Sequence, residues 1–87
     1  MAFQIRKYKL QENPNEYGRQ TRVGYGDILL VAEQYGILHA WIMVNDSVDT
    51  TQVLNVFATG EYIDHNSHTH VGSALVGSFV WHVFKQV

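Results

Sequence analysis

The stretch Gly36-Ile37-Leu38-His39-Ala40-Trp41-Ile42-Met43-Val44 decides the fold. Its even-numbered side chains, Leu38 to Val44, are all apolar, whereas its odd-numbered side chains include one histidine and one tryptophan. Because side chains alternate between the two faces of a β-strand, this pattern predicts a strand whose even-numbered face lies in the core. Gly36 ends the connection Gln34-Tyr35-Gly36 and suits a tight turn that requires positive φ.

The segment before this strand is apolar without interruption from Ile28 to Ala32. The run is too short for a free-standing helix, so we interpret it as a strand that pairs antiparallel with residues 37–44 and is covered on both faces. A second sheet, a closed barrel or another subunit would each supply the second cover.

The rest of the chain predicts further short strands separated by turns that contain glycine. In the first strand the apolar side chains switch face near Arg6–Lys7, which predicts a β-bulge. Glu12 to Glu16 is expected to be a loop, and Tyr62-Ile63 to continue the fifth strand past a bulge. The expected additional strands are residues 3–10, 20–23, 51–58, 69–75 and 79–84. We therefore expect residues 1–87 to form a single all-β domain, a small antiparallel β-sandwich or barrel of six to eight short strands.

The composition limits the possible functions. The chain is 46% hydrophobic and 16% charged, has a formal net charge of −2 and contains no cysteine. Disulfides, thiolate metal sites and cysteine nucleophiles are excluded, and extended nucleic-acid binding is not expected of so few cations. A small, weakly charged domain without such cross-links is expected to form a homo-oligomer. Without an apolar span or signal peptide, we expect no membrane partner and a cytoplasmic location.

Six short motifs occur along nearly the whole chain in a characteristic order: Arg6-Lys7-Tyr8-Lys9-Leu10, Gly26-Asp27-Ile28-Leu29-Leu30-Val31, Leu38 to Trp41, Ala58-Thr59-Gly60, Val71-Gly72-Ser73 and Trp81-His82-Val83-Phe84. In this order the chain resembles a family of small, functionally uncharacterised β-domains found mainly in bacteriophage genomes. Gly24 stands where the family has proline, and Ala58 replaces the first glycine of its Gly-Thr-Gly turn. The resemblance implies a phage origin, and hence the host cytoplasm, but no activity.

Histidines suggest two sites that the sequence leaves open. His65, His68 and His70 have a spacing that can offer imidazoles to Zn²⁺ or Ni²⁺, although a polar loop with exposed histidines explains the pattern more simply, and we expect no metal. His39 and His82 lie in expected strands and would form a catalytic pair only if they face one another. Serine in a nucleophile motif and paired carboxylates are both missing, so we do not expect an enzyme and expect no cofactor.

The set that points most directly to a ligand combines arginines with aromatic residues. Arginine holds phosphate through two parallel hydrogen bonds, and an aromatic face stacks on a nucleobase. The candidate ligand-binding residues are Arg19, Arg22, Tyr25, Trp41 and Tyr62. The alternative explanation is that Trp41 belongs to the core or an interface and that the arginines are solvated.

Two functions fit these observations. The first is a non-enzymatic phage protein that binds and sequesters a ligand such as a nucleotide immune signal and so counters host defence. Its partner is a nucleotide-like small molecule. The second is a protein–protein interaction module, which inhibits a host protein or forms an accessory component of the phage particle.

Overall fold

The computed structural model describes residues 2–14 and 18–87, which form seven strands and no helix. The strands are β1 (Phe3–Lys9), β2 (Gln20–Gly24), β3 (Gly26–Gln34), β4 (Ile37–Asn45), β5 (Thr51–Ala58), β6 (His68–Val76) and β7 (Phe79–Gln86). Within these residues no helix is long and apolar enough to cross a membrane. The all-β prediction is confirmed.

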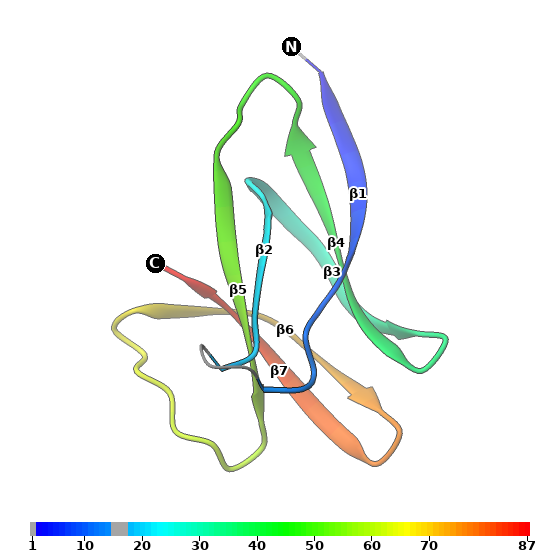
Figure 1. The fold of residues 1–87 in the computed structure, drawn as a ribbon, viewed down its shortest axis with the longest axis vertical. Helices are drawn as coiled ribbons and strands as arrows, with labels where there is room; N and C mark the ends of the chain where they lie inside the picture. The colour runs from blue at the N-terminus through cyan, green and yellow to red at the C-terminus, as the bar shows by residue number, and fades with distance from the viewer. Residues whose placement is uncertain (1, 15–17) are drawn as a thin grey trace.

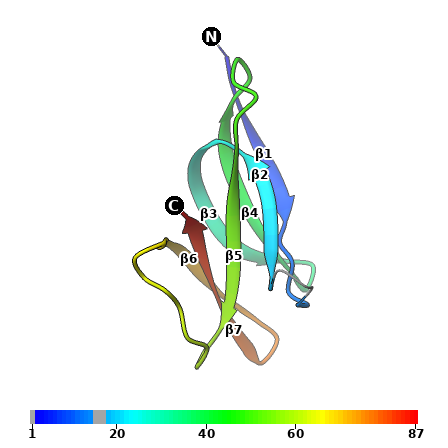
Figure 2. The same ribbon diagram turned by 60° about the vertical axis from the view of Figure 1, so that its left-hand side comes forward.

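The strands form two antiparallel sheets in a sandwich-like arrangement. One sheet has three strands in the order β1-β4-β3, and the other has four in the order β2-β5-β7-β6. Figure 1 shows the sharp connection from β2 into β3, where the chain passes from one sheet to the other, and Figure 2 shows the same arrangement turned. Of the two architectures expected, the sandwich is therefore the better description.

The core lies between the sheets and confirms the assignment of the faces of β4. Leu38, Ala40 and Ile42 are fully buried, together with Leu54 of β5 and Val83 of β7. The sheets approach closely where β6 passes β3, because a Cβ built on Gly72 would lie 2.8 Å from Cβ of Val31. Glycine in β6 thus allows the contact that brings the two sheets together.

Two hairpin turns agree with the expectations. The β3–β4 turn places both central residues at positive φ, 56° for Tyr35 and 77° for Gly36. A two-residue turn with positive φ at both positions has a backbone twist that matches the right-handed twist of the two strands that it joins. At the β6–β7 turn, Gly77 has a φ of 60°. The expected loop at Glu12 to Glu16 is described only as far as Pro14, where no strand forms; Asn15 and Glu16 lie outside the described residues.

Two predictions about the N-terminal strand and the fifth strand are wrong. β1 pairs with β4 in an unbroken register from Phe3↔Asn45 to Lys9↔His39, without the bulge expected near Arg6–Lys7. The apparent change of face arises because Phe3 and Ile5 are apolar but lie on the outer, exposed face. β5 ends at Ala58, and Tyr62-Ile63 belongs to the following loop, because a turn bonded from Glu61 N to Ala58 O interrupts the strand.

The second cover expected for β3 is not supplied by another sheet or by a closed barrel of the same chain, so cover by another subunit stays a prediction. Leu29 is 49% exposed and Leu30 is 53% exposed, and the register shifts between Ile28 and Leu30. The bulge adds one residue to the strand, so two consecutive leucines lie at the surface. The expected cover is absent among the described residues of one chain.

Part of the outer face of the three-stranded sheet is apolar, and Lys7 lies opposite Trp41 on the same face. Cross-strand partners share a face, and the register places Ile5 beside Met43 and Leu30 beside Trp41. We call this surface the apolar face and define it by the residues Phe3, Ile5, Leu30, Trp41 and Met43. Phe3, Ile5 and Leu30 are each more than half exposed.

Candidate functional site

A hollow at the junction of the two sheets brings two cations and a tyrosine together. Arg22 comes from β2, Lys85 from the end of β7, and Tyr25 from the connection between β2 and β3. The Lys85 Nζ atom lies 5.4 Å from the centre of the Tyr25 ring, within the range of a cation–π interaction. We call this space the Arg22 hollow; its volume is about 410 Å³. Its lining consists of Arg22, Tyr25, Thr51, Gln52, Val53, Lys85, Gln86 and Val87.

The two cations of the Arg22 hollow are available to an anion. The Arg22 Nη1 atom donates a 2.9 Å hydrogen bond to Thr51 Oγ1, which fixes the guanidinium without neutralising it. Across residues 2–14 and 18–87 the only ion pairs are Arg6–Asp46 and Arg19–Glu61. Among the described residues, Arg22 and Lys85 are the charged side chains that line the hollow, and no Asp or Glu side chain lines it.

Tyr25 is held by backbone contacts on each side. Its N–H donates to Thr50 O at 3.1 Å, and the buried Gln52 side chain donates to the carbonyl groups of Gly24 and Gly26. A Cβ on Gly24 would lie 2.9 Å from both Tyr8 Oη and Val44 Cγ1, so a larger residue there would require these side chains to shift. Gly24 N donates a 3.0 Å hydrogen bond to Tyr8 Oη.

A second hollow shares Tyr25 with the first. It has a volume of about 590 Å³ and lies beside the start of β1 and β3 and the end of β4. We call it the Asp27 hollow. Its lining consists of Phe3, Tyr25, Gly26, Asp27, Met43, Asn45, Val48 and Thr50. The walls are mainly apolar, with one carboxylate from Asp27 and one amide from Asn45.

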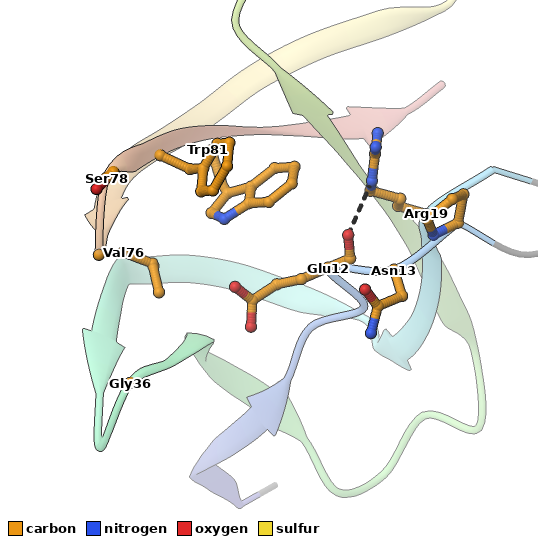
Figure 3. Close-up of a pocket in the computed structure, with 10 residues that line it drawn as sticks. Glu12, Asn13, Arg19, Gly36, Val76, Ser78 and Trp81 are labelled. Carbon is orange, nitrogen blue, oxygen red and sulfur yellow. Dashed lines mark hydrogen bonds between the residues drawn. The ribbon is translucent and has the colours of Figure 1, made fainter.

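A third hollow, of about 650 Å³, lies at the other end of the molecule (Figure 3). The Trp81 indole and the Glu12 carboxylate both point into this space. Arg19 is fixed beside it, because its Nη1 atom pairs with Glu61 at 2.6 Å and its Nε atom donates to Glu12 O at 2.9 Å. The guanidinium also lies 5.1 Å from the centre of the Trp81 ring. Arg19 is thus occupied by its own chain, unlike Arg22.

The five expected ligand-binding residues do not form one site. Arg22 and Tyr25 meet in the Arg22 hollow, while Arg19 lies at the third hollow. Trp41 lies on the apolar face, and Tyr62 is 99% exposed in the loop after β5. Their role in binding stays a prediction, and the geometry favours Arg22 and Tyr25.

Histidines gather instead on the outer face of the four-stranded sheet. Ser73 Oγ lies 2.9 Å from both His70 Nε2 and His82 Nδ1, and His82 Nε2 lies 2.8 Å from Thr59 Oγ1. His70 and His82 each have a hydroxyl partner, and together these side chains form a surface hydrogen-bond network that joins β6, β7 and the turn after β5. His39 is in the other sheet, with Nδ1 2.9 Å from Ile37 O, so it does not face His82.

The three histidines of the metal hypothesis do not share a site, because His68 and His70 form hydrogen bonds with different residues. His68 Nε2 lies 2.9 Å from Asn55 Nδ2, His70 bonds to Ser73, and His65 is exposed in the loop. In the part of the chain that the structure describes, no three His, Cys, Asp or Glu side chains are placed to hold a metal ion.

Sequence reasoning did not single out Lys85 as a ligand-binding residue. It lies 60 residues beyond Tyr25 in the chain, and only the pairing of β5 with both β2 and β7 brings the two together. Asp27 was not singled out as a ligand-binding residue either. The sequence could have pointed to Lys85 and Asp27 only if the pairing of strands far apart in the chain had been known.

The fold and hollows define a small two-sheet β-protein with a positively charged, tyrosine-lined hollow. The family described as "Domain of unknown function (DUF7352)" matches residues 1–87, and the chain belongs to this family. No curated protein and no solved structure matched the chain.

Proposed function

We propose that the protein binds a small, anionic, aromatic ligand of the nucleotide class in the Arg22 hollow, without carrying out chemistry on it. The observation that carries the proposal is the meeting of Arg22, Lys85 and Tyr25 around one space. Arginine offers a phosphate group two parallel donors, and lysine adds a second positive charge. A tyrosine ring supplies a stacking surface for a base.

The dimensions and the lining support binding. A volume of about 410 Å³ lies within the usual range of small-molecule sites. Neither a histidine nor a carboxylate side chain lines this hollow among the described residues, so it holds no obvious pair for acid–base catalysis. The function we propose is therefore sequestration. In a phage protein acting in the host cytoplasm, a nucleotide immune signal is the ligand whose removal would counter host defence.

Isothermal titration calorimetry with a panel of mononucleotides and cyclic dinucleotides tests this function. We expect binding that weakens as salt rises, because phosphate contacts with Arg22 and Lys85 are electrostatic. Arg22→Gln and Lys85→Gln are each expected to weaken binding about tenfold or more, the worth of one charge-assisted hydrogen bond. Lys9→Gln is the charge-matched control, since Lys9 is exposed on β1 and does not line the hollow. Absence of heat with every nucleotide at micromolar protein would reject the proposal.

The apolar face favours a second candidate function, protein–protein interaction, with a second copy of the chain as the first partner. Three strands of up to nine residues span roughly 30 Å by 14 Å, or roughly 400 Å² per copy. An interface of that size lies at the low end of the known range and suits a weak, reversible homodimer. Such a dimer would supply the cover missing from Leu30 and Ile5. A host protein or a phage-particle component is the other occupant, and a pull-down from host lysate separates it from self-association.

A further inference from the structure

We propose that the Asp27 hollow reads the base of the bound nucleotide and selects guanine. This inference rests on the proposed function, because it assumes that the phosphate lies in the Arg22 hollow. Among the described residues, Tyr25 alone lines both hollows. A ligand whose aromatic ring stacks on Tyr25 can therefore place one end beside Arg22 and the other beside Asp27.

The separation of the two ends suits a mononucleotide. Arg22 and Asp27 are five residues apart, so their Cα atoms are at most about 17 Å apart. Both residues are exposed, and Arg22 lines one of the two hollows that share Tyr25 while Asp27 lines the other. Lys85 already lies over the Tyr25 ring in the Arg22 hollow. The base would stack on the ring face turned away from Lys85, toward the apolar walls formed by Phe3 and Met43.

The polar groups of the Asp27 hollow have complementary roles. The Asp27 carboxylate has no hydrogen bond or ion pair within the described chain, and a carboxylate only accepts hydrogen bonds. The Asn45 Oδ1 atom accepts from Ser47 N at 2.9 Å, which leaves the Asn45 Nδ2 group to donate. The hollow thus offers an ionised acceptor and an amide donor above an aromatic and aliphatic wall.

Guanine matches this pattern better than the other bases. Its N1–H and N2–H donors point in parallel and can both reach one carboxylate, while its O6 atom accepts a hydrogen bond. Asp27 would accept from N1 and N2, and Asn45 would donate to O6. Adenine offers a single amino group on that edge, and hypoxanthine lacks the N2 amine. Binding sites that hydrogen-bond a polar group reject the analogue that lacks it.

Titration of wild-type protein, Asp27→Asn and Arg22→Gln with GMP, IMP and AMP tests the selection. Wild type is expected to bind GMP at least tenfold more tightly than IMP or AMP, the effect of losing a hydrogen bond to a charged acceptor. Asp27→Asn should lose this preference while still binding IMP, and Arg22→Gln should weaken all three nucleotides together. Ser73→Ala is the matched control, because Ser73 lies in the histidine network on the outer face of the other sheet.

The outcomes separate the two proposals. Equal affinity for GMP, IMP and AMP in wild type, with all three weakened by Arg22→Gln, would overturn guanine selection and leave the proposed function standing. A GMP preference that persists in Asp27→Asn would also overturn the role of Asp27. No binding of any nucleotide would overturn both proposals. Circular dichroism of each variant checks that the exposed substitutions leave the fold intact.

Discussion

Gln52 clamps the two glycines on either side of Tyr25. Its Nε2 atom donates to Gly24 O at 3.1 Å and to Gly26 O at 2.9 Å, and the residue is only 6% exposed. The Gln52 Oε1 atom is buried without a partner in the described chain. The Gly24 and Gly26 carbonyl oxygens both need a donor, which in the Gln52 amide only the Nε2 group supplies. Exchanging Nε2 and Oε1 by a flip of the amide would therefore break these two bonds without giving Oε1 a reason to be preferred there. The fold tolerates an unsatisfied atom in order to hold the connection between the sheets.

This clamp predicts an order of stability among substitutions at position 52. Gln52→Met loses both donated bonds but also removes the unpaired oxygen, so we expect a loss of about 1–2 kcal/mol. Gln52→Glu places an acceptor, charged when ionised, against two carbonyl oxygens, and should cost about 3 kcal/mol or more. Urea denaturation followed by tryptophan fluorescence measures both. Gln20→Met is the control, because its 3.4 Å bond to Gln86 is exposed. Losses no larger than that of Gln20→Met in both Gln52 variants would show that the clamp is unimportant.

Tyr35 offers a stabilising substitution. Its φ of 56° is unfavourable for a bulky residue, and its side chain is almost fully exposed. Asparagine tolerates this conformation, and Asn-Gly is the preferred pair for a two-residue hairpin turn. We expect Tyr35→Asn to stabilise the protein by about 0.5–1 kcal/mol, measured by thermal or urea denaturation. A decrease in stability would mean that the tyrosine ring makes a favourable contact.

The close approach of Gly72 to Val31 predicts coupling between the two positions. A methyl group on Gly72 would lie 2.8 Å from both Cβ and Cγ2 of Val31, so Gly72→Ala should cost about 1–3 kcal/mol. Val31→Ala removes Cγ1 and Cγ2, so the double variant should lose clearly less than the sum of the two single variants. A double-mutant cycle in urea measures the coupling. Strict additivity would contradict the contact between the two sheets.

The apolar face predicts self-association that a single charge can disrupt. Ile5→Lys and Leu30→Glu place a charge on a surface where the original side chains are more than half exposed, so the fold should survive. Multi-angle light scattering is expected to show wild type heavier than 10.0 kDa at high concentration and both variants at the monomer mass. Tyr62→Lys is the matched control on a distant loop. A wild-type protein that stays monomeric at every concentration would dismiss the dimer.

The sequence allowed the fold class to be predicted because its signal is local. Alternation from Ile37 to Val44 and the turns at Gly36 and Gly77 report on neighbouring residues, and these features agree with the structure. The errors came from assuming that every apolar residue is covered. Ile5, Leu29 and Leu30 are apolar and exposed in the single chain, which led to a false bulge in β1, while cover of β3 by another subunit stays a prediction.

The candidate site was predictable only in part. Arg22 and Tyr25 lie three residues apart and are recognisable as a pair, but their joining with Lys85 depends on the order of β2, β5 and β7. Whether an arginine side chain is free to bind a ligand or is already paired with an acid of its own chain also depends on the tertiary structure. Arg19 and Arg22 look alike in sequence, and only the structure shows Arg19 paired with Glu61.

The most direct test of the account is a map of where a nucleotide binds on the folded protein. Amide and side-chain NMR signals of ¹⁵N-labelled protein are recorded while GMP is added. The account predicts that the largest shifts occur at Arg22, Tyr25, Asp27 and Lys85, with saturation, and that Arg22→Gln weakens them. Shifts centred instead on Trp81 or on the His70–Ser73–His82 network, or no saturable shift, would contradict it.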